Sequence, residues 1–439
     1  MKIRFAVVAA ASAFAALPSC GQGIAVTGNT NITISGLLAV GVKNQDISTG
    51  NATTARTVSN ETGVYDNTSR LIIASTSKIT EGWNVIFRLE SRFTPNVRPG
   101  TVLLPAGSAP PAGLPVAGAT GWADGDTWGG VSSPYGSIVV GKSTLYYTDT
   151  ISAGYLAPSL EQPGESYRIW DCNGLASFNL LSTYQTGSIN AAGAYSPAKS
   201  NILGNTRSQN VIRYDSVLFK PTGSDLLQFS LAFSKNAAGA QNDWSAAASS
   251  YYEGGSTIYG KVLYNGYGFS ASASYLDQHF QGLPNIPAVP TGPFNDELKA
   301  MRFGLSYKWM GLKVGVVYDS TVMSDGIFNA TGATLSDAKR NVIEVPISYS
   351  FGDHAVYATW TKASNTSSIA DSGAKQLNFV YDYALTKRAF VGISYTKIDN
   401  DAHGLYQGFL TGYSPFGGSN IAFPGEGWKQ ISVNLNYWF

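Results

Sequence analysis

The fold is decided by residues 430–439, QISVNLNYWF, at the end of the sequence. All odd-numbered positions in this stretch are apolar, and all even-numbered positions are polar except Trp438. Successive side chains of a β-strand point to opposite faces of a sheet. The stretch therefore predicts a strand with one apolar face and one polar face.

The same period of two recurs along the chain, for example at residues 267–275, 303–309 and 343–351. Taken in order, the pattern predicts about sixteen strands, and an even number is expected when both ends of a barrel wall lie on one side. The expected strands lie near 31–43, 69–78, 83–93, 126–133, 136–145, 209–219, 226–234, 257–264, 267–276, 300–309, 312–321, 341–351, 354–362, 375–384, 389–398 and 428–439. Tight turns alternate with long polar loops between them, which is typical of a barrel.

The composition favours a wall that faces lipid on one side and water on the other. Only 13% of residues are charged, against about 25% in soluble domains. The mean hydropathy of −0.03 nevertheless shows that the chain is not apolar overall. A soluble sandwich would also alternate, but here the polar faces hold Gly, Ser and Asn, and aromatic residues gather at strand ends. We therefore predict an all-β, transmembrane antiparallel β-barrel.

The N-terminal residues indicate export. Lys2 and Arg4 precede the apolar stretch 5–17, which is typical of a signal peptide over residues 1–21. We expect the mature barrel domain to span residues 22–439. Cys20 allows the alternative of a lipoprotein signal, which Pro18 disfavours.

Other classes of function find little support. Removal of Lys2 and Arg4 leaves 27 basic and 28 acidic residues, so nucleic-acid binding is not expected. The three histidines, His279, His354 and His403, show no metal-ligand spacing, and each is expected to be a solvated loop residue. We therefore predict no cofactor and no enzymatic activity.

Charges at lumen-facing positions are the candidate functional residues. In the strand near 83–93, Arg88, Glu90 and Arg92 alternate with apolar side chains. Exposure of Arg or Lys to lipid at the membrane midplane costs roughly 2–4 kcal/mol, so these charges should face the lumen. The same reasoning applies to Arg70, Arg213, Arg302 and Lys308. For any single residue the alternative is an ordinary solvated charge.

The segment 146–208 is too long for an ordinary loop, and such connections are usually functional or disordered. We expect it to fold inward and to narrow the lumen as a constriction loop. Its Glu161 and Glu165 would then oppose the arginines, and the transverse field would sort ions by charge. Ordinary loop solubility is the alternative for both acids. Residues 175–184 could add one more strand, which would need a partner.

Several motifs, in this order and spacing, resemble strands of the Gram-negative general diffusion porins. They are Ser69-Arg70-Leu71, WNVIFRLES at 83–91, YGSIVVGK at 135–142, VIRYDS at 211–216, YDYALTKR at 381–388 and YWF at 437–439. This family has sixteen strands per subunit and assembles as trimers in the outer membrane. Ala74 departs from its pattern, in which a basic residue usually follows the Arg-Leu pair closely, so the resemblance does not predict the selectivity.

The resemblance implies that Arg70, Lys142 and Arg213 line a basic wall of the constriction, opposite the inward third loop. Alternation adds Arg88 and Arg92 to this wall. The predicted acidic groups are Glu90, Glu161 and Glu165. Tyr437 and Phe439 would be read by the barrel-assembly machinery.

We therefore expect a homotrimeric outer-membrane porin, surrounded by lipid, that passes ions and small hydrophilic solutes by passive diffusion. A weak preference for anions follows if the arginines dominate. One alternative is a substrate-specific porin in which Tyr155, Tyr167 and Trp170 stack a solute. Another is an adhesin or structural anchor with a plugged lumen, and an embedded hydrolase ranks last.

Overall fold

The computed structural model describes most of the strands and short turns. The described residues are 22–26, 29–52, 60–66, 69–93, 123, 125–146, 149, 178–181, 183–189, 195–202, 208–223, 225–235, 256–281, 295–329, 334–406 and 424–439. The predicted signal peptide, residues 1–21, lies outside them. Among the described residues, no helix has the length and apolar character needed to cross a membrane.

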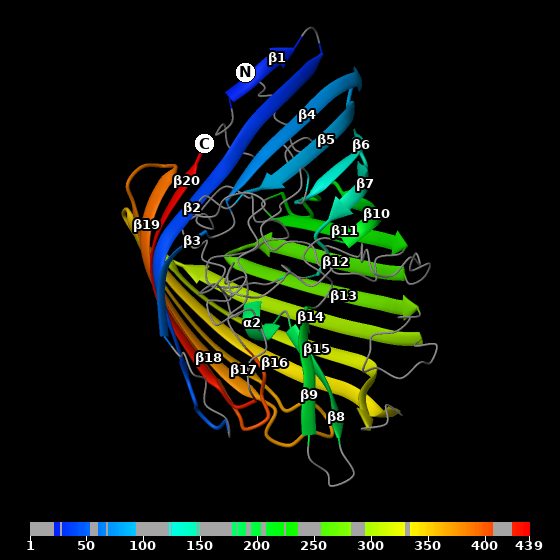
Figure 1. The fold of residues 1–439 in the computed structure, drawn as a ribbon. Helices are drawn as coiled ribbons and strands as arrows, with labels where there is room; N and C mark the ends of the chain where they lie inside the picture. The colour runs from blue at the N-terminus through cyan, green and yellow to red at the C-terminus, as the bar shows by residue number, and fades with distance from the viewer. Residues whose placement is uncertain are drawn as a thin grey trace, which may run out of the picture.

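The strands form one antiparallel wall that closes on itself, as Figure 1 shows. Its members are β2 (Thr30–Ser48), β3 (Asn60–Asp66) with β4 (Arg70–Thr80), β5 (Trp83–Arg92), β6 (Thr127–Ser133), β7 (Gly136–Ser143), β10 (Ser208–Ser216), β11 (Leu226–Lys235), β12 (Ser256–Gly266), β13 (Phe269–Gln281), β14 (Asn295–Trp309), β15 (Leu312–Asn329), β16 (Thr334–Phe351), β17 (His354–Ala363), β18 (Ala374–Ala384), β19 (Ala389–Asn400) and β20 (Gly427–Trp438). β3 and β4 pair consecutively with β2 and make one wall strand. β2 also pairs with β20, which closes a barrel of sixteen strands and confirms the predicted fold.

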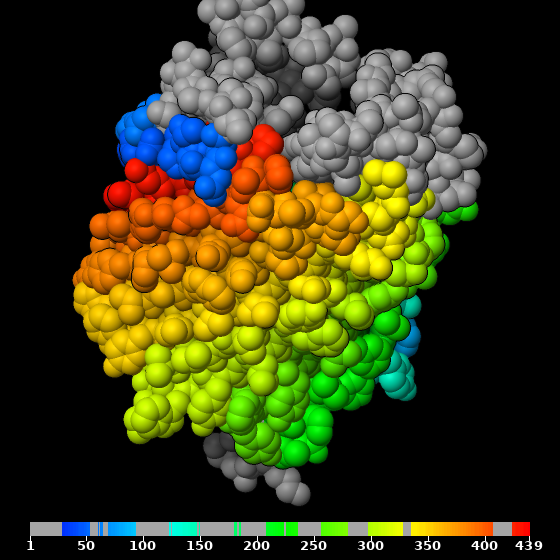
Figure 2. Space-filling model, turned by 90° about the horizontal axis from the view of Figure 1, so that it is seen from below, coloured from blue at the N-terminus to red at the C-terminus, as the bar shows by residue number. Residues whose placement is uncertain are grey.

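Alternation along each strand separates a lipid-facing surface from an inner surface. In β20, Ile431 is 53% exposed and Val433 is 48% exposed, whereas Gln430 is 1% exposed. Figure 2 shows the outer wall from below, where successive strands from red through yellow to green lie next to each other. Apolar side chains outside and polar side chains inside reverse the order of a soluble protein, as expected of a barrel in lipid.

Aromatic side chains gather at the ends of the strands that short turns connect. Phe269 packs on Tyr307 with 4.7 Å between ring centroids, and Phe351 stacks on His354 at 5.1 Å. Tyr437 and Phe439 lie 6.3 Å apart at the end of β20. Rings of this kind suit the interface between lipid and water.

The C-terminal residue completes the seam between the first and last wall strands. The amide of Phe439 donates to the carbonyl of Gly36 at 3.1 Å, and the amide of Gly36 donates back to Phe439 at 3.1 Å. A further short strand, β1 (Gln22–Val26), pairs with the start of β2 beside this seam. The terminal phenylalanine therefore joins the closing ladder.

The long connection between β7 and β10 contains its own secondary structure. It includes a helical turn, α2 (Phe178–Leu181), and a hairpin of β8 (Thr183–Ile189) and β9 (Tyr195–Ile202). β7 pairs directly with β10, so the hairpin is not part of the wall. Of the possible extra strand at 175–184, residues 178–181 form α2 and residues 183–184 begin β8. Its partner is β9, and the wall stays at sixteen strands.

Candidate functional site

Four charged side chains meet on the inner face of β4 and β5. Arg70 begins β4, and Arg88, Glu90 and Arg92 follow at every second position of β5. In the ladder Arg70 lies opposite Arg92. The spacing of two therefore brings three arginines around one glutamate, as the alternation predicted for β5.

Glu90 is fully buried and is the shared partner of the three guanidinium groups. Arg88 Nη2 lies 3.1 Å from Glu90 Oε2, while Arg70 Nη1 and Arg92 Nε each lie 3.5 Å from Glu90 Oε1. Arg70 is also fully buried, and the Arg92 side chain is 14% exposed. Burial of one carboxylate with three guanidinium groups makes this part of the wall electropositive.

Arg213 lies on the inner face of β10, two wall strands beyond β6. Its Nε lies 2.9 Å from Asp215 Oδ2, and both side chains are largely buried. In the ladder Arg213 is opposite Val139, which is buried on the inner face of β7. The structure thus gives Arg213 a local counter-ion.

Lys142 is not brought to the arginine cluster. In the ladder it pairs with Thr127, while its neighbour Gly141 pairs with the buried Trp128. Lys142 therefore lies on the opposite row from the inner-facing residues. Its Nζ donates to the carbonyl of Ala123 at 2.6 Å. Its place in a constriction stays a prediction.

A second buried network lies on β14, β15 and β16. Asp319 of β15 accepts from Arg302 Nε at 2.9 Å and from Arg340 Nη2 at 3.4 Å. The hydroxyl of Thr321 donates to the same carboxylate at 2.9 Å. Counting from β2, β4 is the second wall strand and β14 the tenth. Strands halfway round a closed barrel face each other, so the two networks lie on opposite walls.

This second network holds parts of the long β7–β10 connection. Arg302 donates to the carbonyls of Tyr146, Asp149 and Leu181 at 3.2, 3.1 and 2.7 Å. Arg340 donates to Leu180 at 2.8 Å and to Leu181 at 3.1 Å. α2 contacts β16 and β17, and Figure 1 draws it on the inner side of the wall. Tyr146, Asp149 and α2 therefore contact the inner face of the barrel.

Side chains of the connection add to these contacts. The Tyr146 hydroxyl donates to Asp319 at 2.7 Å, and its ring lies 4.6 Å from the Arg302 guanidinium carbon. The Asp149 carboxylate accepts from the hydroxyl of Tyr259 and lies 3.2 Å from Lys261 Nζ. Both residues thus tie the start of the connection to β12, β14 and β15.

Sequence reasoning singled out Arg302 but missed most of its partners. Asp319 has inner-face spacing within the strand predicted near 312–321, so the signal used for Arg88 could have found it. Arg340 lies one residue before the strand predicted near 341–351. Tyr146 and Asp149 stand in no repeating pattern. Glu161 and Glu165, with the aromatic Tyr155, Tyr167 and Trp170, lie outside the described residues.

A closed barrel with an apolar outer surface and a charged, polar inner surface defines the class of β-barrel membrane channels. The profile of the Gram-negative porins matches residues 5–403, and the chain belongs to this family. It is therefore a channel of the outer membrane for passive diffusion.

Solved structures share the fold at low sequence identity. The anion-selective porin from Comamonas acidovorans superimposes with a TM-score of 0.62 at 16% identity, covering 93% of this chain and 100% of that one. The trimer form of OmpT from Vibrio cholerae gives 0.54 at 9% identity, with 94% and 100% covered. The outer membrane channel DcaP of Acinetobacter baumannii gives 0.53 at 13%, with 95% and 99% covered. No curated protein sequence matches.

Proposed function

We propose that the channel prefers small anionic solutes and anions, and that Arg70, Arg88 and Arg92 provide this preference. The observation that carries the proposal is the sharing of one carboxylate, Glu90, by three guanidinium groups on the inner wall. Guanidinium groups stay charged at all physiological pH values. An anion that passes this wall is attracted and a cation is repelled, as at charged rings in other pores.

We further propose that the long connection narrows the lumen opposite this cluster, with Glu161 and Glu165 on its acidic side. The contacts of Tyr146, Asp149 and Leu181 with Arg302 support a connection held within the barrel. The Comamonas porin is described as anion-selective. We propose the same preference here on the charges of the inner wall, because the likeness itself is one of fold.

The reversal potential of the channel in a planar bilayer under a salt gradient tests the preference. One unit charge about 10 Å from an ion in water changes its energy by about 0.4 kcal/mol. We therefore expect Arg88→Gln to lower the ratio of anion to cation permeability about two- to fourfold. Glu161→Gln should raise the same ratio.

Lys397→Gln is the matched control. It removes the same charge from the exposed end of β19, where Lys397 pairs with Asp399 at 2.7 Å on the outer surface. This variant should leave the ratio unchanged. An unchanged ratio in Arg88→Gln, or an equal change in Lys397→Gln, would refute the assignment of the arginine cluster and leave the channel itself in place.

We also propose a homotrimer without enzymatic activity or cofactor, matured by removal of residues 1–21 and folded by the barrel-assembly machinery acting on Tyr437 and Phe439. The family resemblance supports the trimer, and the apolar outer wall supports contact with lipid. The mass of the detergent-solubilised particle, measured by light scattering, should equal three chains. A monomeric mass would contradict it. A solute-specific channel would instead show conductance that one solute blocks.

A further inference from the structure

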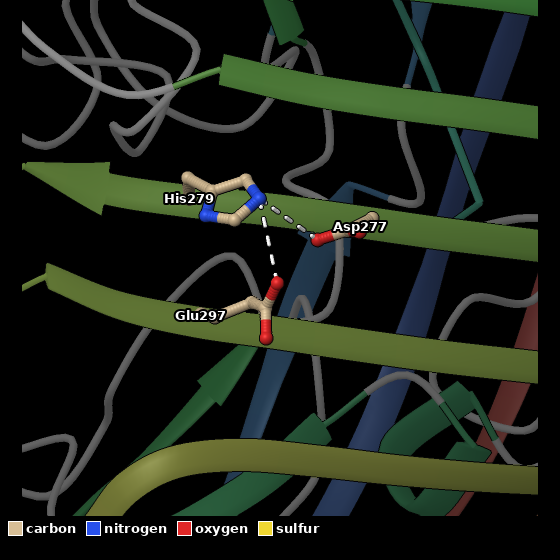
Figure 3. A group of neighbouring side chains, drawn as sticks. All are labelled: Asp277, His279 and Glu297. Atoms are coloured by element: carbon tan, nitrogen blue, oxygen red, sulfur yellow. Dashed lines mark ion pairs between the residues drawn. The ribbon is translucent and has the colours of Figure 1, made fainter.

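Three potential metal ligands meet on the outer surface near the ends of β13 and β14, away from the lumen. Asp277 and His279 lie on β13, and Glu297 lies on β14. Figure 3 shows the imidazole of His279 directed toward both carboxylates. His279 is thus a strand residue, whereas the sequence predicted a solvated loop residue.

Strand geometry fixes the positions of these three side chains. His279 lies directly opposite Glu297 in the β13–β14 ladder. Asp277 is two residues before His279 and therefore shares its face of the sheet. This is the outer face, because Tyr275 and Met301 on the same rows are exposed. The backbone of a continuous barrel wall therefore presents the three groups together without help from a loop.

The distance from His279 to each carboxylate matches the spacing between two ligands of one metal ion better than it matches the length of a hydrogen bond. His279 Nε2 lies 3.4 Å from Asp277 Oδ1 and 3.4 Å from Glu297 Oε1. A hydrogen bond to a charged group is usually about 2.7–2.9 Å long. Two ligands each about 2.0–2.1 Å from a tetrahedral Zn²⁺ lie roughly 3.3–3.4 Å apart. All three ligand atoms lie within 4.8 Å of one another.

One ligand atom also lacks another partner. Asp277 Oδ1 is buried and accepts no hydrogen bond from any described residue. Its second oxygen accepts from the Tyr275 hydroxyl at 3.2 Å, which orients the carboxylate. A buried carboxylate oxygen without a hydrogen bond is uncommon, because its desolvation is then only partly compensated. A bound cation would provide that compensation.

We propose that Asp277, His279 and Glu297 bind one divalent transition-metal ion of the zinc type, with a fourth position open to solvent. One imidazole and two carboxylates are ligands that Zn²⁺ accepts, and three protein ligands leave a tetrahedral position free. Lys299 Nζ lies 2.6 Å from Glu297 Oε2 and leaves Oε1 directed at His279. The ion would join the end of β13 to the start of β14.

Calorimetric titration of the untagged, full-length protein in detergent with ZnCl₂ at neutral pH tests this site. We expect saturable binding of one ion per chain. His279→Ala and Asp277→Asn should each weaken it at least about tenfold, the smallest loss usual for residues that support a metal site.

His403→Ala is the matched control, because His403 is a half-buried histidine away from the three ligands, and its Nδ1 lies 2.8 Å from the backbone carbonyl oxygen of Ala370. This variant should bind zinc as the wild type does. Cobalt substituted for zinc should give the visible absorption of a tetrahedral site, which His279→Ala should lose. Circular dichroism verifies that each variant keeps its β-structure. No saturable binding by the wild type, or equal binding by folded His279→Ala, would overturn the proposal.

Discussion

Gly36 is the residue that lets the chain close its barrel at the C-terminus. It exchanges two backbone hydrogen bonds with Phe439. A Cβ atom at Gly36 would lie 2.4 Å from the Phe439 ring and 2.5 Å from the carbonyl oxygen of Arg70. Real side chains essentially never approach so closely, and the second obstacle is backbone. The position of the Phe439 ring therefore requires a residue without a side chain at position 36.

Gly36→Ala should destabilise the barrel. Extra atoms in a closely packed position cost typically about 1–3 kcal/mol, because neighbours must move. We expect the variant to unfold at a lower temperature than the wild type. The measurement is the temperature at which the band of the folded barrel disappears on a denaturing gel. Gly260→Ala is the matched control in β12, where a Cβ atom would find Leu231 Cδ2 at an ordinary 3.6 Å. Equal unfolding temperatures for the two variants would contradict a special role of Gly36.

Individual pore-facing residues were predictable where alternation is strict. Arg88, Glu90 and Arg92 follow every second position of a strand whose other face is apolar, and the structure places all three inside. Lys142 shows the limit of this reasoning. Its strand has similar faces on both sides, and the ladder with β6 assigns it to the row opposite the inner one.

At the scale of elements, Arg302 bonds to more backbone carbonyls of the long β7–β10 connection than any other residue in the described part of the chain. Its planar guanidinium group reaches Asp319 and three backbone carbonyls at once. Lysine carries the same charge but lacks the rigid fork of donors. Hydrogen bonds to charged groups are worth about 1.5–3 kcal/mol each, so the loss of two or three would loosen this attachment.

Arg302→Lys should therefore increase current noise and mean conductance in single-channel recordings, because the connection becomes free to move in the lumen. Selectivity should change little, since the charge is kept. Arg388→Lys makes the same exchange at the turn before β19 and should leave recordings like those of the wild type. Unaltered noise in Arg302→Lys would show that other contacts, such as Lys261 with Asp149, hold the connection by themselves.

All sixteen wall strands were predictable, because lipid on one side imposes a period of two on each of them. The ends of some strands, beyond the predicted bounds, were not predictable. β15 continues from the predicted end near 321 to Asn329, and β13 continues through Asp277 and His279. The outward positions Asp277 and His279 of β13 are not apolar, and β15 has a register shift between Met323 and Ile327. The periodic signal therefore stops while hydrogen bonding goes on. The β8–β9 hairpin was missed because it is stabilised by distant contacts, including pairing with β15.

For the whole molecule, the selectivity proposed above depends on the electric field that Arg70, Arg88 and Arg92 create in the lumen. These three residues, on β4 and β5, share Glu90. Such a field is screened by salt over a distance of about 10 Å at 0.1 M and about 3 Å at 1 M. An ion in the middle of a lumen therefore senses the arginines in dilute salt far better than in concentrated salt.

The ratio of anion to cation permeability should accordingly decline as the salt concentration on both sides rises from about 0.1 M to about 1 M at a constant gradient. Arg88→Gln should begin from a lower ratio and decline less, because part of the field is already lost. Reversal potentials of both proteins over this range measure the effect. A ratio that does not depend on salt would instead indicate direct contact of ions with a narrow binding site. No mobile ions would then lie between the permeating ion and the charged groups to screen them.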